Sequence, residues 1–81
     1  MLKIYGTMQC KDCVECVAAY QDKGVSYEFL EFHESLVNLK EFLLLRDTNP
    51  VFAELRGSGK IGIPCIVTEE NYVTLDWQQF V

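Results

Sequence analysis

The sequence predicts a small α/β domain, and three observations lead to this fold class. Residues 2–5 form a short apolar run that is typical of a buried strand. From Asp12 to Gly24 the apolar residues recur at helical spacing. Residues 25–32 then alternate apolar and polar side chains and are rich in aromatics, as in a second strand. A helix that joins two strands over so short a distance makes them parallel neighbours in one sheet.

A second helix and a short helical piece follow. The helix opens at Glu34 and Ser35, and apolar residues cover so much of its surface that we expect it to be deeply packed. Asn49 as cap and Pro50 at the first helical position then start the short piece.

The last third of the chain predicts a hairpin. Residues 61–68 form a third strand entered through Pro64, and residues 72–75 form a fourth strand after a turn at 69–71. A last helical turn follows. We therefore expect one domain, residues 1–81, with a four-stranded mixed sheet flanked by helices in the order strand, helix, strand, helix, strand, strand, helix.

Composition and charge exclude several classes of partner. Twelve acidic and seven basic residues give a formal net charge of −5, and no cluster of Lys and Arg is present to follow a phosphate backbone. No apolar segment reaches the roughly 20 residues of a membrane helix, and the N-terminus does not resemble a signal peptide. We therefore expect a soluble, cytoplasmic protein without a nucleic-acid or membrane partner, and we expect a monomer.

The cysteines are concentrated near the N-terminus. Cys10, Cys13 and Cys16 lie too close together in the sequence to staple distant parts of a fold, and only Cys65 lies elsewhere. This usage fits a reducing compartment, in which thiols react or bind a ligand.

The Cys10 and Cys13 pair predicts disulfide chemistry, because it follows a strand and opens a helix. Free backbone N–H groups and the positive end of the helix dipole favour a thiolate on Cys10, whose pKa would otherwise be about 8.5. Cys10 is the predicted nucleophile, and Cys13, one helical turn further on, is the predicted resolving thiol. Lys11 and Asp12 between them carry opposite charges that nearly cancel.

Other interpretations of the cysteines stay open at this point. Cys10, Cys13, Cys16 and Cys65 together could hold zinc or an iron–sulfur cluster, or form a redox-sensing module. Cys16 and Cys65 could equally be small buried hydrophobic residues. Three cysteines so close on one helix do not match the two knuckles of a structural zinc site, so we expect no metal.

Two motifs stand out: residues 5–13 read Tyr-Gly-Thr-Met-Gln-Cys-Lys-Asp-Cys, and residues 62–64 read Gly-Ile-Pro. In these motifs and in the order of its elements, the sequence resembles the glutaredoxin family, above all its small bacterial glutaredoxin-related proteins. The resemblance implies a thioredoxin-like fold and a thiol–disulfide oxidoreductase or electron carrier that reduces protein disulfides or glutathione mixed disulfides. It also implies glutathione as cofactor and a reductase as partner.

The resemblance further implies the residues that bind a substrate. Pro64 is expected to be a cis-proline beside the cysteine pair, with the Ile63 backbone offering strand-like hydrogen bonds to a thiol peptide. Many glutaredoxins have a lysine at the position of Thr7. They also have a glycine pair that helps to bind the glutamyl end of glutathione, and in this chain Thr74 and Asp76 are the residues of that stretch that could take part of this role. The expected substrate-binding set is Thr7, Gln9, Lys11, Ile63, Pro64, Thr74 and Asp76.

Overall fold

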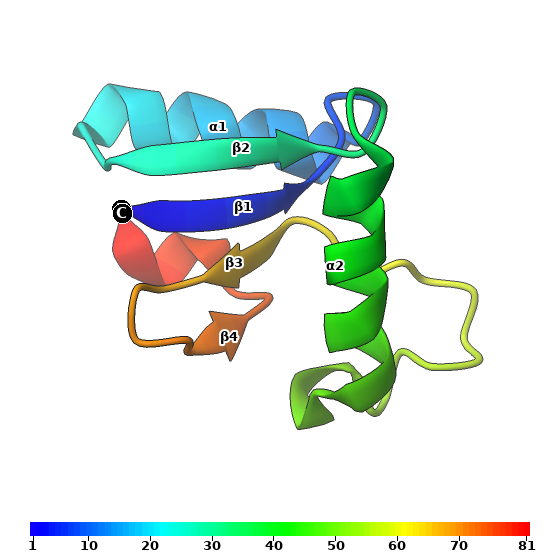
Figure 1. Ribbon diagram of the computed structural model, residues 1–81. Helices are drawn as coiled ribbons and strands as arrows, with labels where there is room; N and C mark the ends of the chain where they lie inside the picture. Colours follow the sequence, from blue (N-terminus) through cyan, green and yellow to red (C-terminus); the bar gives the residue numbers. More distant parts are fainter.

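Four strands form one mixed sheet (Figure 1). The computed structural model describes all residues, 1–81. β1 (Leu2–Gly6) pairs in parallel with β2 (Tyr27–Glu31) and antiparallel with β3 (Cys65–Val67), which pairs antiparallel with β4 (Val73–Thr74). The order across the sheet is β2-β1-β3-β4. The predicted α/β class, the parallel first pair and the final hairpin are confirmed.

α1 (Lys11–Lys23) connects β1 to β2 and packs on one face of the sheet (Figure 1). It ends, as predicted, at Gly24, whose left-handed backbone (φ 69°) suits a residue without a side chain. The buried side chains of α1 are Cys13, Cys16, Val17 and Tyr20. Two of the four cysteines of the chain are therefore on the core side of this helix.

α2 (Leu36–Thr48) packs on the other face and runs across the strand direction (Figure 1). Ser35 caps it by accepting a hydrogen bond from the backbone N–H of Asn38 (3.3 Å). The expectation that this helix is deeply packed is wrong, because Phe42 is its one fully buried residue. The sheet covers one side of the helix, and the apolar residues of α2 extend well beyond that side.

Two short 3-10 helices complete the chain. Asn49 caps η1 (Pro50–Phe52), where the sequence predicts a short helical piece. Asp76 caps η2 (Trp77–Phe80) by accepting a hydrogen bond from the N–H of Gln78 (3.2 Å), and η2 is the predicted last turn. The order of elements in the chain therefore agrees with the prediction.

β3 is shorter than predicted, since it begins at Cys65 and residues 61–64 lie outside it. Gly62 has a positive φ of 94°, and Pro64 has no backbone N–H to give to a neighbouring strand. The segment that leads into β3 is therefore a loop, which leaves space beside the end of β1.

Two apolar clusters lie on opposite faces of the sheet, because neighbouring residues of a strand point to opposite sides. Ile4 and Ile66 pack with residues of α1 and η2, whereas the adjacent Tyr5 and Cys65 pack with residues of α2 and η1. Neither α1 nor α2, each 13 residues long, has the length and apolar character that crossing a membrane requires.

Candidate functional site

Cys10 lies at the junction between the loop after β1 and the start of α1. It is the N-cap of the helix: its amide donates to the carbonyl of Thr7 (3.0 Å) and its carbonyl accepts from the N–H of Val14 (3.1 Å). Its thiol makes no capping hydrogen bond and is partly exposed. Cys10 therefore presents a thiol at the positive end of the helix dipole, accessible to a reaction partner.

Cys13 lies one turn further along α1 and is fully buried. Gly6 makes room for it, since a Cβ atom at Gly6 would lie 2.6 Å from the Cys13 sulfur. Burial, with a contribution from the Cys10 thiol, raises the pKa of Cys13 to about 12, although a backbone hydrogen bond at Thr7 acts in the opposite direction. Cys13 is therefore protonated at neutral pH.

A cavity of about 580 Å³ opens beside Cys10. This volume is typical of sites that bind small molecules. One wall is the loop between β1 and α1, and the other is the segment between η1 and β3. The first wall consists of Thr7, Gln9, Cys10 and Asp12, and the second of Leu55 and residues 59–63.

Arg46 of α2 holds the second wall in place. Its guanidinium donates hydrogen bonds to the carbonyl groups of Lys60 (2.6 Å), Ile61 (2.8 Å) and Leu55 (3.4 Å). Arg46 has no acidic partner, so its donors serve this segment. The fork of a guanidinium group suits the task, because it can reach several acceptors at once.

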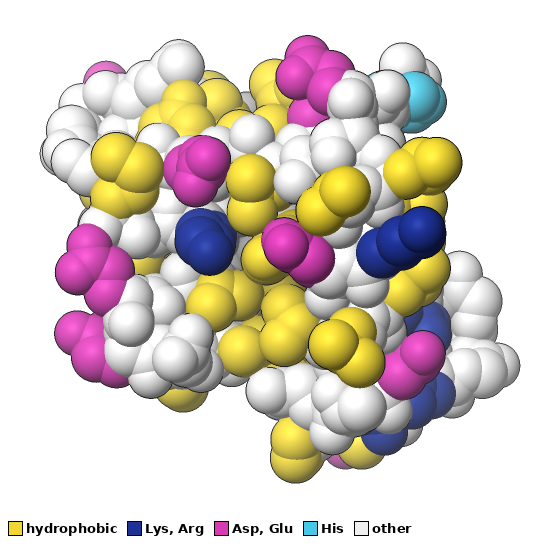
Figure 2. All heavy atoms as spheres, in the orientation of Figure 1, with side chains coloured by type: hydrophobic (Ala, Val, Ile, Leu, Met, Phe, Trp, Pro, Cys, Tyr) yellow, Lys and Arg dark blue, Asp and Glu magenta, His cyan; other side chains and the backbone are white.

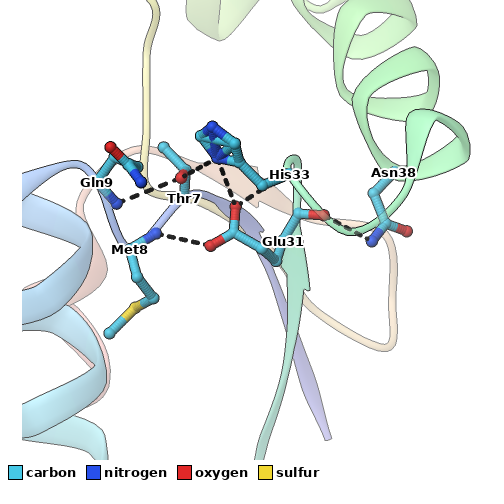
Figure 3. A network of polar contacts seen from close by, with 6 residues as sticks. All are labelled: Thr7, Met8, Gln9, Glu31, His33 and Asn38. Carbon is cyan, nitrogen blue, oxygen red and sulfur yellow. Dashed lines mark hydrogen bonds and ion pairs between the residues drawn. The ribbon is translucent and has the colours of Figure 1, made fainter.

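Glu31, at the end of β2, ties down the loop before Cys10 (Figure 3). Its carboxylate accepts hydrogen bonds from the backbone N–H groups of Met8 (2.8 Å) and His33 (3.0 Å), and His33 Nδ1 lies 3.8 Å from it. The same ring nitrogen lies 3.3 Å from the hydroxyl oxygen of Thr7. Burial raises the pKa of Glu31, but the two amides, the Thr7 hydroxyl and the His33 ring together outweigh this effect and hold the pKa below its usual range.

Sequence reasoning missed Lys60 and Glu31. Lys60 is the one basic residue of the cavity lining, and Asp12 is the one acidic residue. The position of Lys60, four residues before Pro64, could have indicated it, because Pro64 was expected beside the cysteine pair. The role of Glu31 carried no sequence signal, since it depends on the register that sets Glu31 beside Gly6 in the parallel pair.

Four predicted substrate-binding residues lie at or next to the cavity. Thr7, Gln9 and Ile63 line it together with Cys10. The Ile63–Pro64 peptide bond is cis, as the resemblance implies, and Pro64 itself is buried.

Three other predicted binding residues lie outside the cavity lining. Lys11 is exposed and pairs with Glu15 on the next turn (4.0 Å). Thr74 is buried, and its hydroxyl accepts hydrogen bonds from the N–H of Asp76 (3.1 Å) and the side-chain amide of Gln79 (3.0 Å). Thr74 and Asp76 therefore make their polar contacts within the C-terminal turn instead of in the cavity.

The four cysteines do not converge on one site. Cys16 belongs to the cluster under α1, and Cys65 belongs to the cluster under α2 on the opposite face of the sheet. This separation contradicts a single metal or sensing site built from Cys10, Cys13, Cys16 and Cys65, and no group of three or more His, Cys, Asp or Glu residues is arranged to hold a metal ion. Burial raises the pKa of Cys16 to about 11 and that of Cys65 to about 12.

An uncharacterized protein of Haemophilus influenzae is 37% identical to this chain over 67 residues, which span 83% of the chain and 78% of the relative. The chain belongs to the family of this Haemophilus protein. No protein-family model matches the chain, and no solved structure matches it. The name of the Haemophilus relative states no activity.

Proposed function

We propose that the protein is a thiol–disulfide oxidoreductase or electron carrier that works through a Cys10–Cys13 dithiol. One observation carries the proposal: a thiol at the N-cap of α1 opens to a cavity of about 580 Å³, and a second thiol lies buried one turn behind it. We also propose a thioredoxin-like fold of the glutaredoxin type. The strand order β2-β1-β3-β4 and the place of the cysteines directly after β1 support it.

The reaction begins at Cys10. Its thiolate attacks one sulfur of a disulfide R–S–S–R′, so that a bond forms between Cys10 and the R–S group and the original S–S bond breaks. R′S⁻ leaves and accepts the proton of Cys13. The Cys13 thiolate then attacks the Cys10 sulfur and expels RS⁻, which takes up a proton from water. The dithiol is thereby oxidised to a disulfide, and the substrate is reduced by two electrons.

The raised pKa of Cys13 fits its role as the second thiol to react. A protonated Cys13 can donate to the Cys10 thiolate, which stabilises the nucleophile before substrate arrives. Cys13 becomes a nucleophile once R′S⁻, the first thiolate to leave, accepts its proton. The cavity takes the substrate, and a reductant such as glutathione or a reductase restores the dithiol.

Glutathione or a cysteine-containing segment of a protein is the proposed substrate. The backbone of Ile63 lies in the cavity wall, where it suits an extended peptide, and Lys60 supplies a positive charge for a carboxylate. The four free thiols, three of them buried, fit a reducing, cytoplasmic compartment.

The test compares reduction of a glutathione mixed disulfide with reduction of a protein disulfide. We expect wild type to reduce at least one of them, Cys10→Ser to reduce neither, and Cys13→Ser to accumulate a mixed disulfide on Cys10. A wild-type protein that reduces neither substrate would point to a non-catalytic adaptor and contradict the proposal.

A further inference from the structure

α2 turns a strip of apolar side chains away from the rest of the protein. Figure 2, which has the orientation of Figure 1, shows hydrophobic side chains gathered over this helix. Consecutive helix residues are about 100° apart, so the exposed apolar residues of α2 lie within a strip about 120° wide. Single exposed apolar residues are common, but several of them on one side of a helix mark an interaction site. The strip consists of Leu36, Val37, Leu43 and Leu44, which are 70%, 62%, 43% and 67% exposed.

Lys40 and Asp47 run down the middle of this strip. They are seven residues apart, which places them on the same side of the helix but about 10 Å apart along its axis. Both are exposed, and neither takes part in an ion pair. Asp47 also lies in the last turn of α2, where a negative charge is unfavourable beside the helix dipole. The strip therefore carries one unpaired charge of each sign between two apolar edges.

We propose that this strip is the interface of a homodimer, in which the α2 helices of two copies pack antiparallel about a two-fold axis. A two-fold interface repeats every contact, so a register with Lys40 opposite Asp47 of the second copy also sets Asp47 opposite Lys40. The same register brings Leu43 against Leu44 of the second copy, and Leu44 against Leu43, at the axis. One arrangement thus pairs both charges and covers the most central apolar residues.

The charge pattern favours a second copy over an unrelated partner. In two antiparallel α2 helices, each Lys40 can face Asp47 of the other copy. In two parallel helices in register, Lys40 would face Lys40 and Asp47 would face Asp47, so like charges would meet. No residue of α2 lines the cavity beside Cys10, so the residues of this interface are not residues of the cavity. The proposal is therefore independent of the proposed redox function, and it replaces the expectation of a monomer.

Sedimentation equilibrium on the reduced full chain tests the interface. We expect wild type to dimerise with rising concentration up to about 1 mM, a range that detects even a weak complex. Leu44→Glu is expected to remain monomeric, because it places a carboxylate from each copy in the apolar centre of the interface. The Leu44 side chain is mostly exposed, so the change leaves the core of each copy intact. Val14→Glu, a matched change of an exposed aliphatic residue on α1 (41% exposed), should dimerise like wild type.

Charge reversal tests the register. Lys40→Glu and Asp47→Lys should each weaken the dimer about tenfold or more when studied alone. In either variant, residues 40 and 47 carry the same charge, and they face each other at both symmetry-related contacts. An equimolar mixture of the two variants should recover association, because each then meets its opposite charge. A wild type that stays monomeric at about 1 mM, a Leu44→Glu variant that dimerises like wild type, or single reversals without effect would overturn the proposal.

Discussion

Cys10 and Cys13 are three residues apart, yet one is partly exposed at a cavity and the other is fully buried. The geometry of α1 produces this difference, because the N-cap residue lies outside the first turn while Cys13 faces the sheet. Cys16 and Cys65 are buried in two separate clusters without access to the cavity. The four thiols should therefore differ sharply in reactivity.

At pH 7 under reducing conditions, iodoacetamide is expected to modify Cys10 and to leave the other three cysteines as thiols. Burial keeps Cys13, Cys16 and Cys65 inaccessible and raises their pKa to about 11 or about 12, so they have almost no thiolate. Peptide mass spectrometry after a brief exposure measures the sites, with the urea-unfolded chain as the control in which all four react. Faster modification of Cys13 than of Cys10 would contradict the assigned roles.

Gly6→Ala is expected to lower the free energy of unfolding by about 1–3 kcal/mol, because the new Cβ atom would lie 2.6 Å from the Cys13 sulfur. Urea denaturation of the reduced protein measures the change. The same substitution in a Cys13→Ala background should cost much less, since the colliding sulfur is gone. An equal cost in both backgrounds would show that the contact with Cys13 is not the cause.

At the scale of elements, the loop before Cys10 is held by the end of β2. Glu31 reaches this loop because the parallel pairing of β1 and β2 places Gly6 beside Glu31. The carboxylate then satisfies the amides of Met8 and His33. Glu31 is therefore a positioning residue for Cys10, through the loop that precedes it.

Glu31→Gln is expected to lower the free energy of unfolding by about 1–2 kcal/mol at pH 7, because one of the two amides would face an NH₂ donor instead of an oxygen. The pKa of Glu31 is lowered in the fold, so its contribution is fully present above the ordinary Glu pKa of about 4.3 and is lost as the pH falls through the folded value. Urea denaturation of both proteins from pH 7 to pH 3 measures it. A difference between them that stays constant over this range would contradict the charged role of Glu31.

The elements themselves were largely predictable from local patterns. The C-cap at Gly24 and the N-caps at Ser35 and Asp76 mark helix ends by chemistry that acts within a few residues. The start of β3 was not predictable, because it depends on the positive φ that the backbone adopts at Gly62. The packing of α2 was not predictable either, since counting apolar residues does not reveal how much of a helix the sheet covers.

At the scale of the whole molecule, one sheet separates two cores. Cys16 lies in one core, Cys65 lies in the other, and Cys13 is buried beside Gly6. Each thiol gains burial in the fold and becomes exposed on unfolding. Because the fold favours their neutral form, the unfolded chain loses protons first as the pH rises. The stability that these thiols contribute is therefore complete below the pKa of an unfolded cysteine, about 8.5, and is lost above it.

The free energy of unfolding of the reduced protein is expected to be nearly constant from pH 6 to pH 8 and to fall above pH 9. Cys13, Cys16 and Cys65, with pKa values raised to about 11 or 12, should each contribute a slope of about 1.4 kcal/mol per pH unit. Urea denaturation between pH 6 and pH 10.5 measures the profile, and Cys16→Ala should make it shallower. A stability that stays constant up to pH 10.5 would contradict the burial of these thiols.

The candidate site was predictable in part. Cys10, Cys13, Thr7, Gln9 and Ile63 follow from motifs that are local in sequence, and the structure brings them together. Lys60 and the support from Arg46 were missed, because they depend on how a loop folds back against α2. The separation of Cys16 from Cys65 depends on which side of a strand a residue faces, which a one-residue change of register would reverse.

The most direct test of the proposed dithiol is a redox titration of the full chain in thiol–disulfide buffers, with remaining thiols blocked and mapped by mass spectrometry. We expect one reversible two-electron step that links Cys10 to Cys13, with Cys16 and Cys65 remaining thiols throughout. A chain in which Cys10 and Cys13 stay reduced in every buffer, or in which Cys10 pairs with another cysteine, would contradict the account.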